Sequence, residues 1–316
     1  MMQELPARQT QSYLSNLLRS RNIWPKNKLG QNFLIDLNLM GLVIQAAELT
    51  PEDVVLEVGS GTGSLTNMLL ANARSVISVE VDPNFQRLTE ESVLHHPNFT
   101  LIKSDVLKGK NQIQPIVIDT IKKRLKEFNT AKFKLVANLP YAVATPVISN
   151  LMIGDLVPER IVGMVQYEIA EKFISQPGSK EYGALAVLAQ SLSRIEIVRK
   201  IPPSAFWPRP KVDSAIIRIQ PDEQLRGKLD FPTPAGITGV QVFRFFLRDL
   251  YAHRRKNLRG AILSMQDNTW TKEEVDQKLL KLNIPGNERA EVLSIEQHQS
   301  LCKEFMAGHK QIKHPD

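Results

Sequence analysis

The sequence is poor in the residues that crosslink proteins or hold metal ions. Its single cysteine, Cys302, permits no internal disulfide, and its six histidines show no spacing typical of a metal site. No apolar run approaches the roughly 20 residues needed to span a bilayer. The first residues, MMQELPARQTQSYL, also lack the apolar core of a secretion signal. These absences predict a cytoplasmic protein with no metal ion and no membrane contact.

What the sequence does contain is typical of a globular protein. Hydrophobic residues make up 42% and charged residues 23% of the 316 residues, which is enough to bury a large core in two domains. The 40 lysines and arginines exceed the 33 aspartates and glutamates, for a net charge of +7. This moderate excess permits a polyanionic partner such as a nucleic acid, but it does not require one.

Apolar strand patterns alternate with helical patterns up to about residue 220. An amphipathic helix with Asp36 as its N-cap precedes them. Strands are predicted at 54–58, 75–79, 99–103, 134–137 and 161–165, and helices at 83–93, at 146–153 and after residues 64 and 169. This alternation predicts an α/β fold with a doubly wound parallel sheet. Two further strands, at 195–200 and 214–220, are predicted to form an antiparallel hairpin at its edge.

The remainder of the chain has a different pattern. Residues 221–239 are rich in proline and glycine and lack periodicity, as expected of a linker. Helical patterns follow at 240–263, 272–280 and 295–307. The predicted domains are a helical extension at 1–25, an α/β domain at 26–220 and a small C-terminal helical domain at 221–316.

A glycine-rich turn follows the first strand. In VVLEVGSGTGSLT, Gly59, Gly61 and Gly63 stand between an apolar strand and a helix, where they allow a sharp turn and the close approach of a ligand. Glu80 ends the second strand, and a carboxylate there can accept both hydroxyls of a ribose. The G-x-G-x-G spacing favours S-adenosylmethionine over a nicotinamide or flavin cofactor, whose pyrophosphate uses G-x-G-x-x-G. A purely structural turn is the third alternative.

Asp105 follows the third strand of the predicted sheet. Because the carboxyl ends of the strands face the ligand crevice in such a sheet, its carboxylate can accept the exocyclic amine of adenine. An aspartate at this position can equally cap a helix or stabilise a turn.

The fourth strand ends in Asn138-Leu139-Pro140-Tyr141. Two hydrogen-bond acceptors placed on the exocyclic amine of a nucleobase would favour a pyramidal, nucleophilic nitrogen. The side chain of Asn138 and the carbonyl of Leu139 supply such acceptors, and Pro140 stiffens the chain around them. Tyr141 can stack on a base that is flipped out or unpaired. Alone, the motif would indicate a strand-terminating turn with a core tyrosine, but the glycine turn and the two carboxylates on the same sheet favour a catalytic role.

Seven stretches of the chain carry a family resemblance. They are LGQNFLID (29–36), LEVGSGTGSLT (56–66), VEVD (79–82), SDVL (104–107), NLPYAVATPVI (138–148), PPSAFWPRPKVDSAIIRI (202–219) and RRKNLRGAI (254–262). In this order they resemble the ribosomal RNA adenine dimethyltransferases of the KsgA/RsmA type. The resemblance implies a Rossmann-like S-adenosylmethionine-dependent methyltransferase sheet and a C-terminal helical domain that contacts RNA. It also implies dimethylation of the N6 amines of two adjacent adenosines in the 3′-terminal hairpin loop of 16S rRNA, within the immature small ribosomal subunit. The protein is expected to act as a monomer.

The resemblance also assigns roles to residues. The catalytic residues would be Asn138, Leu139, Pro140 and Tyr141. The cofactor would be held by Asn32, Leu34, Gly59, Gly61, Glu80, Asp105 and Asn138. Phe206 would be a second ring that stacks on the target adenine, with plain core packing as the alternative.

Three features depart from the family pattern. Ala144 stands where a serine is expected, with Ala142 in a variable position beside it. Tyr167 replaces a usual lysine, and the region 108–132 is longer than usual. None of these positions is expected to touch the reacting atoms, although together they can alter RNA binding.

The region 241–260 holds five arginines and one lysine but a single aspartate. On a continuous helix, Arg244, Arg248, Arg255 and Arg259 would fall within an arc of about 60°, at roughly 100° per residue. Such a stripe suits a ribose-phosphate backbone, because guanidinium groups match phosphate oxygens. The alternative is an ordinary solvated face, which the shortage of acidic neighbours disfavours.

The preferred function is therefore dimethylation of small-subunit rRNA. The nearest alternative is a relative that methylates large-subunit rRNA and gives macrolide resistance, which the Asn-Leu-Pro-Tyr motif and the 202–219 stretch disfavour. A non-catalytic factor in ribosome assembly or transcription is disfavoured by the intact site residues. A nicotinamide oxidoreductase is the remaining alternative, and it predicts binding of NADH.

Overall fold

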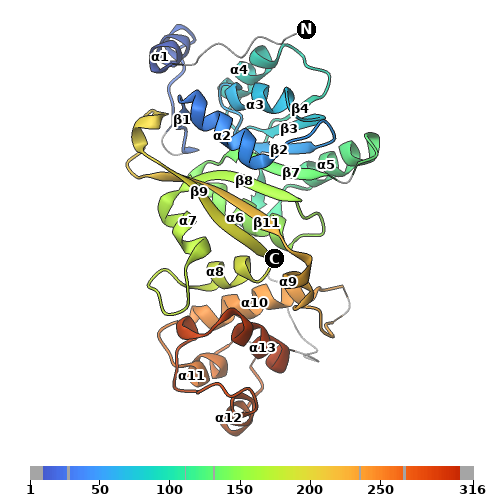
Figure 1. The fold of residues 1–316 in the computed structure, drawn as a ribbon, viewed down its shortest axis with the longest axis vertical. Helices are drawn as coiled ribbons and strands as arrows, with labels where there is room; N and C mark the ends of the chain where they lie inside the picture. The colour runs from blue at the N-terminus through green and yellow to red at the C-terminus, as the bar shows by residue number, and fades with distance from the viewer. Residues whose placement is uncertain are drawn as a thin grey trace. The chain divides into compact units, whose positions relative to one another are not determined.

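The main sheet of the protein has seven strands. The structure, a computed structural model, describes residues 10–26, 29–110, 112–130, 132–234, 236–265 and 268–306. The strands are β2 (Val54–Val58), β3 (Ser75–Val79), β4 (Phe99–Ile102), β7 (Phe133–Asn138), β8 (Arg160–Gln166), β9 (Ser193–Ile201) and β11 (Ser214–Pro221). They lie in the order β4-β3-β2-β7-β8-β11-β9 (Figure 1). The first five in this order run parallel and β11 runs antiparallel to β8, which confirms the predicted doubly wound sheet.

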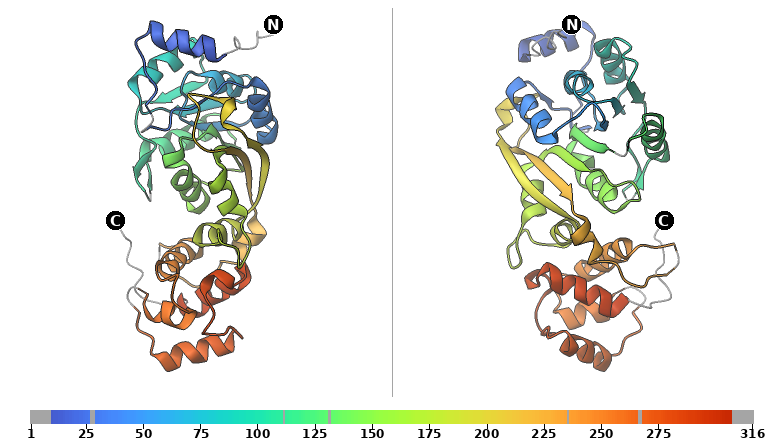
Figure 2. Two further views of the ribbon diagram at one scale, coloured as in Figure 1. Left: turned by 90° about the vertical axis from the view of Figure 1, so that its left-hand side faces the viewer. Right: turned by 45° about the vertical axis from the view of Figure 1, so that its right-hand side comes forward.

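Helices cover both faces of this sheet, because its central strands are apolar on both sides (Figure 2). The helices on one face are α2 (Leu37–Ala47), α3 (Ser64–Leu70) and α4 (Pro83–Val93). Those on the other face are α5 (Pro115–Glu127) and α6 (Tyr141–Ile153). Asp36 caps α2 as predicted, since its carboxylate accepts the N–H groups of Asn38 and Leu39.

The order of the strands reverses between β2 and β7. The chain runs outward from β2 through β3 to β4, then returns to the other side of β2 and continues to β8. The carboxyl ends of β2 and β7 therefore border the switch point, where ligands bind in open α/β sheets. Gly59 directly follows β2 and Asn138 ends β7, so both reach this edge of the sheet as predicted.

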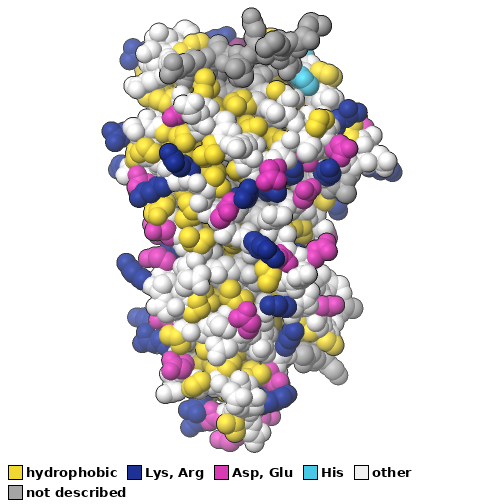
Figure 3. Space-filling view, viewed as in Figure 1, with side chains coloured by type: hydrophobic (Ala, Val, Ile, Leu, Met, Phe, Trp, Pro, Cys, Tyr) yellow, Lys and Arg dark blue, Asp and Glu magenta, His cyan; other side chains and the backbone are white. Residues whose placement is uncertain are grey.

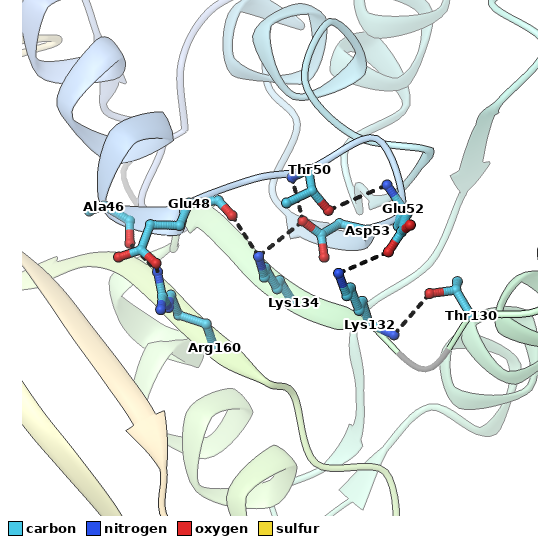
Figure 4. A network of polar contacts seen from close by, with 9 residues as sticks. All are labelled: Ala46, Glu48, Thr50, Glu52, Asp53, Thr130, Lys132, Lys134 and Arg160. Atoms are coloured by element: carbon cyan, nitrogen blue, oxygen red, sulfur yellow. Dashed lines mark hydrogen bonds and ion pairs between the residues drawn. The ribbon is translucent and has the colours of Figure 1, made fainter.

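The amino ends of the same strands carry a buried polar network (Figure 4). Lys134, near the start of β7, is 3% exposed and donates to the carbonyl of Glu48 at 2.7 Å and to Oδ2 of Asp53 at 2.9 Å. The N–H of Thr50 donates to the same carboxylate oxygen at 2.6 Å. Arg160, which begins β8, bonds Oε2 of Glu48 at 2.7 Å. The network connects the end of α2 and the loop before β2 to strands β7 and β8.

The N-terminal helix packs against the unit that contains the sheet. Leu18 of α1 (Gln11–Ser20) lies in a small apolar cluster with Phe85 of α4. Both terminal nitrogens of the Arg21 guanidinium bond the carboxylate of Glu91, at 3.0 and 2.8 Å. The described part of the predicted extension is therefore held on the α/β unit.

The chain divides into two compact units. The first comprises the described residues up to 170 together with 196–220, and the second comprises 171–195 and the described residues from 221 onward. Residues 171–195, placed in the α/β domain by the sequence, thus group with the C-terminal helices. The helices of this second unit include α8 (Ala184–Gln190), within 171–195, and the C-terminal helices α9 (Glu223–Gly227), α10 (Gly239–Ala252), α11 (Leu258–Leu263), α12 (Lys272–Lys281) and α13 (Ile295–Met306). The functional division of the chain stays a prediction.

Two of the helix predictions are wrong. The region 240–263, predicted as one helix, forms the separate helices α10 and α11. Asn257 causes the break, because its side chain accepts the N–H of Gly260 at 2.9 Å and caps a new helix. Helix α6 begins at Tyr141 and not at residue 146, because Pro140 lies at the N-cap, where its missing N–H removes no helical hydrogen bond.

The insert at 108–132 folds into a short hairpin and a helix. The hairpin pairs β5 (Leu107–Gly109) with β6 (Gln112–Ile113), and α5 follows it. No helix in the described ranges is long and apolar enough to cross a membrane. The same ranges contain no group of three or more histidine, cysteine, aspartate or glutamate residues that could hold a metal ion.

Candidate active site

A cavity of about 320 Å³ lies at the carboxyl ends of the parallel strands. Its volume falls within the range of about 300–1,000 Å³ that is typical of ligand pockets. The predicted cofactor-binding residues that line it are Asn32, Leu34, Gly59, Gly61, Glu80, Asp105 and Asn138. All seven residues assigned to the cofactor from the sequence therefore line the same cavity.

The glycine turn after β2 lets the chain pass close to the cavity. Gly59 and Gly61 have φ angles of 81° and 57°, in the region that favours glycine. A Cβ atom on Gly59 would lie 3.1 Å from Cγ of Pro140, and one on Gly61 would lie 3.0 Å from the ring of Phe33. Any side chain at these two positions would therefore push the walls of the cavity apart.

Glu80 follows β3 and is 7% exposed. Its Oε2 accepts the N–H of Gly61 at 3.1 Å, and its Oε1 accepts the N–H of Asp82 at 3.0 Å. These bonds fix the carboxylate beside the glycine turn and leave lone pairs on both oxygens for hydroxyl donors. Burial raises the pKa of the Glu80 carboxyl above its ordinary value, although both backbone donors oppose that effect.

Asp105 lies at the exposed rim of the cavity. Its Oδ1 accepts the N–H of Leu107 at 2.8 Å, so the residue does stabilise a turn. The two roles considered from the sequence are compatible, because Oδ2 remains as an acceptor for a ligand.

The side-chain amide of Asn138 is held in one orientation. Its Nδ2 donates a 3.0 Å hydrogen bond to the carbonyl of Asn32, a group that can only accept. The bond therefore identifies the amide nitrogen and leaves Oδ1 as the acceptor for a ligand. This is the orientation that binding an exocyclic amine requires.

The rest of the Asn-Leu-Pro-Tyr motif differs in its access to the cavity. Pro140 lines the cavity, whereas Leu139 and Tyr141 are not among the described residues that line it. The side chain of Leu139 packs over Gly163, where a Cβ would lie 3.0 Å from Cδ1 of the leucine. The hydroxyl of Tyr141 lies 2.7 Å from that of Ser214, which is fully buried. The roles of the leucine carbonyl and the tyrosine ring stay predictions.

Phe206 is buried in the structure. Strand β1 (Phe33–Leu34) pairs with β10 (Phe206–Trp207), and this pairing places Phe206 opposite Leu34. The ring is 3% exposed and packs in the apolar core beneath α2 and α3. This burial agrees with the alternative of core packing, and the role of Phe206 as a second stacking ring stays a prediction.

The predicted arginine stripe does not form. Arg244 and Arg248 lie on α10, Arg255 lies between helices and Arg259 lies on α11, so no single helix presents all four. Arg259 also forms an ion pair with Asp276 of α12. The break between α10 and α11 is the physical reason for the difference.

Several arginines of the region 241–260 form ion pairs with aspartate or glutamate side chains. Arg248 bonds Asp249 at 2.8 Å, and Arg254 bonds Glu291 at 2.6 Å. On the face seen in Figure 3, lysine and arginine side chains lie among aspartate and glutamate side chains and do not form one continuous patch. The expected shortage of acidic partners is therefore wrong, while RNA contact by these arginines stays a prediction.

Several side chains that line the cavity were not predicted from the sequence. Phe33 and Phe85 both line it, and their ring centroids are 5.0 Å apart with a tilt of 40°. Gln31 and Ala142 line it as well. Phe33 and Gln31 lie in the recognised GQNFL stretch, whereas Phe85 and Ala142 lie on helices, where an apolar pattern marks core positions and wall positions alike.

Glu57 is a buried carboxyl beneath the glycine turn. It is 1% exposed, and its Oε2 accepts the hydroxyls of Thr66 at 2.7 Å and Ser78 at 2.6 Å. Burial raises the pKa of Glu57 to about 7, against the effect of both hydroxyl donors. The sequence shows a glutamate within an apolar strand, but it does not reveal the two hydroxyl partners, which lie in α3 and β3.

The part of the chain that is similar to known proteins includes all the residues of this site. A family model described as ribosomal RNA adenine dimethylase matches residues 24–307. The chain belongs to this family. The dimethylase is 36% identical to ribosomal RNA small subunit methyltransferase A of Lachnoclostridium phytofermentans over 289 aligned residues. This alignment covers 90% of this chain and 93% of the relative. It is therefore a methyltransferase.

Two crystal structures share the fold of this dimethylase. A dimethyladenosine transferase from Plasmodium falciparum has a TM-score of 0.67 and 23% identity, covering 85% of this chain and 96% of that chain. The 23S rRNA methyltransferase ErmE has a TM-score of 0.58 and 23% identity, covering 87% of this chain and 99% of that chain. Because both structures match, the fold alone does not choose between RNA substrates.

Proposed function

We propose that this dimethylase transfers methyl groups from S-adenosylmethionine to the N6 amines of two adjacent adenosines in the 3′-terminal hairpin loop of 16S rRNA, in the immature small ribosomal subunit. The observation that carries the proposal is the fixed amide of Asn138, which keeps Oδ1 as an acceptor in a cavity lined by Glu80 and Asp105. The name of the small-subunit relative supports the choice of RNA.

The residues of the cavity suit S-adenosylmethionine. The Glu80 oxygens each have capacity for a ribose hydroxyl, and Asp105 has a free acceptor for the adenine amine. Asn32 and Leu34 would hold the cofactor from the opposite wall, and Gly59 and Gly61 leave room for contact with the backbone. When bound, the sulfonium of this cofactor supplies an electrophilic methyl group.

The protein would act mainly by positioning the target amine. Asn138 Oδ1 and the carbonyl of Leu139 would accept its two hydrogens and favour a nucleophilic nitrogen. The ring of Tyr141 would stack on the adenine, and the hydrogen bond between its hydroxyl and Ser214 would limit rotation of the ring. Such alignment supplies most of the acceleration in a direct displacement.

The remaining parts of the proposal concern partners and location. We infer that the protein is cytoplasmic and monomeric. We also infer that no metal ion takes part, because the displacement needs neither a metal nor a strong base. Arg244, Arg248, Arg255 and Arg259 are retained as candidate RNA contacts, among which Arg248 and Arg255 are exposed to solvent.

Transfer of labelled methyl groups to unmethylated ribosomal subunits tests the proposal. We expect label in the small subunit, and nucleoside analysis should recover it as N6,N6-dimethyladenosine. Label in the large subunit alone would support the 23S alternative. Cofactor binding without transfer to either subunit would support a non-catalytic factor, and binding of NADH in calorimetry would support an oxidoreductase.

A further inference from the structure

A buried carboxylate beside the candidate ribose site has no part in the chemistry described above. Asp82 follows Glu80 by two residues, and its side chain is 1% exposed. Its Oδ1 caps α4 by accepting the N–H of Asn84 at 3.0 Å. Its Oδ2 is bonded instead to a segment that is distant in the sequence.

This segment forms one wall of the cavity. We name residues 29–34 the cover segment, since all six line the cavity. Asp82 Oδ2 accepts Nε2 of Gln31, inside the cover segment, at 3.0 Å, and Nζ of Lys26, just before it, at 2.9 Å. Oε1 of Gln31 accepts the N–H of Lys26 at 2.6 Å, which closes a ring of hydrogen bonds.

The bonds to Asp82 are charge-assisted. Burial alone would raise the pKa of Asp82, but the donors Lys26, Gln31 and the Asn84 amide hold that pKa below its ordinary value. The carboxyl is therefore ionised at neutral pH, and hydrogen bonds to an ionised acceptor are stronger than those between neutral groups.

Asp82 also connects the cover segment to Glu80 and the glycine turn. Its N–H donates to Oε1 of Glu80, whose Oε2 accepts the N–H of Gly61 in the glycine turn. The cover segment has a second attachment, the bond from Asn138 to the carbonyl of Asn32. The two attachments are made at adjacent residues of the cover segment, Gln31 and Asn32, and only the second involves a residue assigned to the reaction.

We propose that Asp82 is a positioning residue that holds the cover segment closed over the bound cofactor. The inference rests on the proposed function, because it takes S-adenosylmethionine as the ligand of the cavity. Asp82 is not among the described residues that line the cavity, so it acts through Gln31 and Lys26. Its loss should raise the rate of cofactor dissociation more than it slows association.

The variant Asp82→Asn separates this role from helix capping. Asparagine keeps an oxygen for the N–H of Asn84 and is a good N-cap, but its nitrogen cannot accept from Lys26 or Gln31. We expect the affinity for S-adenosylhomocysteine in calorimetry to fall by at least about tenfold, because the variant loses the two charge-assisted hydrogen bonds that hold the cover segment. Without ligand, backbone amides of the cover segment should exchange hydrogen faster, while those of α4 should exchange as in the wild type.

The control variant is Glu91→Gln. It lies on the same helix, changes the charge in the same way and leaves only one oxygen to accept from Arg21, and neither Arg21 nor Glu91 is among the described residues that line the cavity. It should change neither the affinity nor the exchange in the cover segment. Lys26→Met should weaken binding in the same direction as Asp82→Asn, and Lys26→Arg should restore it.

Several outcomes would overturn the proposal. These are wild-type affinity in Asp82→Asn, an equal loss in Glu91→Gln, or faster exchange in α4 together with the cover segment, which would indicate damage to the cap. If the wild-type protein fails to bind S-adenosylhomocysteine, the proposed function fails instead. Hydrogen exchange in the ligand-free proteins then decides by itself whether Asp82 holds the cover segment.

Discussion

The two ends of strand β7 carry polar side chains that the protein uses in opposite ways. At the amino end, Lys134 is buried, and its bonds to Asp53 and to the carbonyl of Glu48 are internal. At the carboxyl end, the amide nitrogen of Asn138 donates a hydrogen bond within the protein, to the carbonyl of Asn32, and its amide oxygen remains as an acceptor for a ligand. A buried charge is therefore not by itself the mark of a site in this sheet. Unused hydrogen-bonding capacity beside a cavity is the better criterion.

The cause of the difference is the topology of the sheet. At the amino ends, the loop between α2 and β2 covers the strands and supplies partners for their charges (Figure 4). At the carboxyl ends, the chain turns away in both directions from the switch point, which leaves the cavity. The two ends should consequently respond differently to mutation, one in stability and the other in chemistry.

The largest effect is expected at the amino end. Lys134→Met would leave Asp53, which is 0% exposed, without its charged partner. Removing one member of a buried ion pair costs about 3–5 kcal/mol, so we expect a loss of that order in the free energy of unfolding, measured by urea denaturation. Binding of S-adenosylhomocysteine by the folded protein should be unchanged.

The matched control for this prediction is Lys132→Met. Lys132 pairs with Glu52 at 2.8 Å on the same edge, but both side chains are largely exposed. Its loss should change stability far less than the loss of Lys134. Equal effects of the two variants would show that the buried network does not stabilise the fold.

A smaller effect, which depends on pH, is expected in the middle of β2. The pKa of Glu57 is raised from 4.5 to about 7, so the folded state holds its proton more strongly than the unfolded state. This stabilisation is fully present below pH 4.5 and is lost as the pH rises through 7, which corresponds to about 3 kcal/mol. Glu57→Gln keeps an acceptor for Thr66 and Ser78 and should remove this slope.

Denaturant unfolding of both proteins between pH 4.5 and 8 measures the difference. The variant should be more stable than the wild type at pH 8, because it carries no charge at this buried position. Parallel stability curves for the two proteins would mean that Glu57 titrates alike in the folded and unfolded states.

The smallest effect concerns RNA binding by the second unit. Arg255 is exposed and has no acidic partner among the residues that the structure describes, whereas Arg259 is paired with Asp276. Each phosphate contact contributes about 0.7–0.9 to the slope of log affinity against log salt concentration. Arg255→Gln should lower this slope for rRNA by one contact and Arg259→Gln by less. The reverse order would contradict the assignment.

Much of the fold was predictable because its signals are local. Strands buried on both faces are continuous apolar runs, and the glycine turn and the Asn-Leu-Pro-Tyr motif mark where two of them end. Gly59, Gly61, Glu80, Asp105 and Asn138 end or follow strands whose order obeys a general rule for open sheets, whereas Asn32 and Leu34 were assigned by the family resemblance alone. The first five residues could therefore be assigned to one edge of the sheet before any contact was known.

The features that the sequence did not reveal arise where distant segments meet. Phe206 is buried by the pairing of β10 with β1, and Arg259 is neutralised by an aspartate on another helix. The bonds of Asp82 to the cover segment are equally remote in sequence. The two wrong helix boundaries did have local signals. Asn257 is an N-cap residue that the surrounding helical pattern concealed, and Pro140 lies at the N-cap of α6.

Methyl transfer by Asn138→Ala tests the central claim most directly. The rate of transfer to unmethylated small subunits would be measured alongside the affinity for S-adenosylhomocysteine, since the same side chain also bonds the carbonyl of Asn32. We predict that transfer falls about 100-fold or more through loss of alignment, while the affinity changes only a few-fold. A variant that retains both cofactor binding and the wild-type rate of transfer would contradict the account.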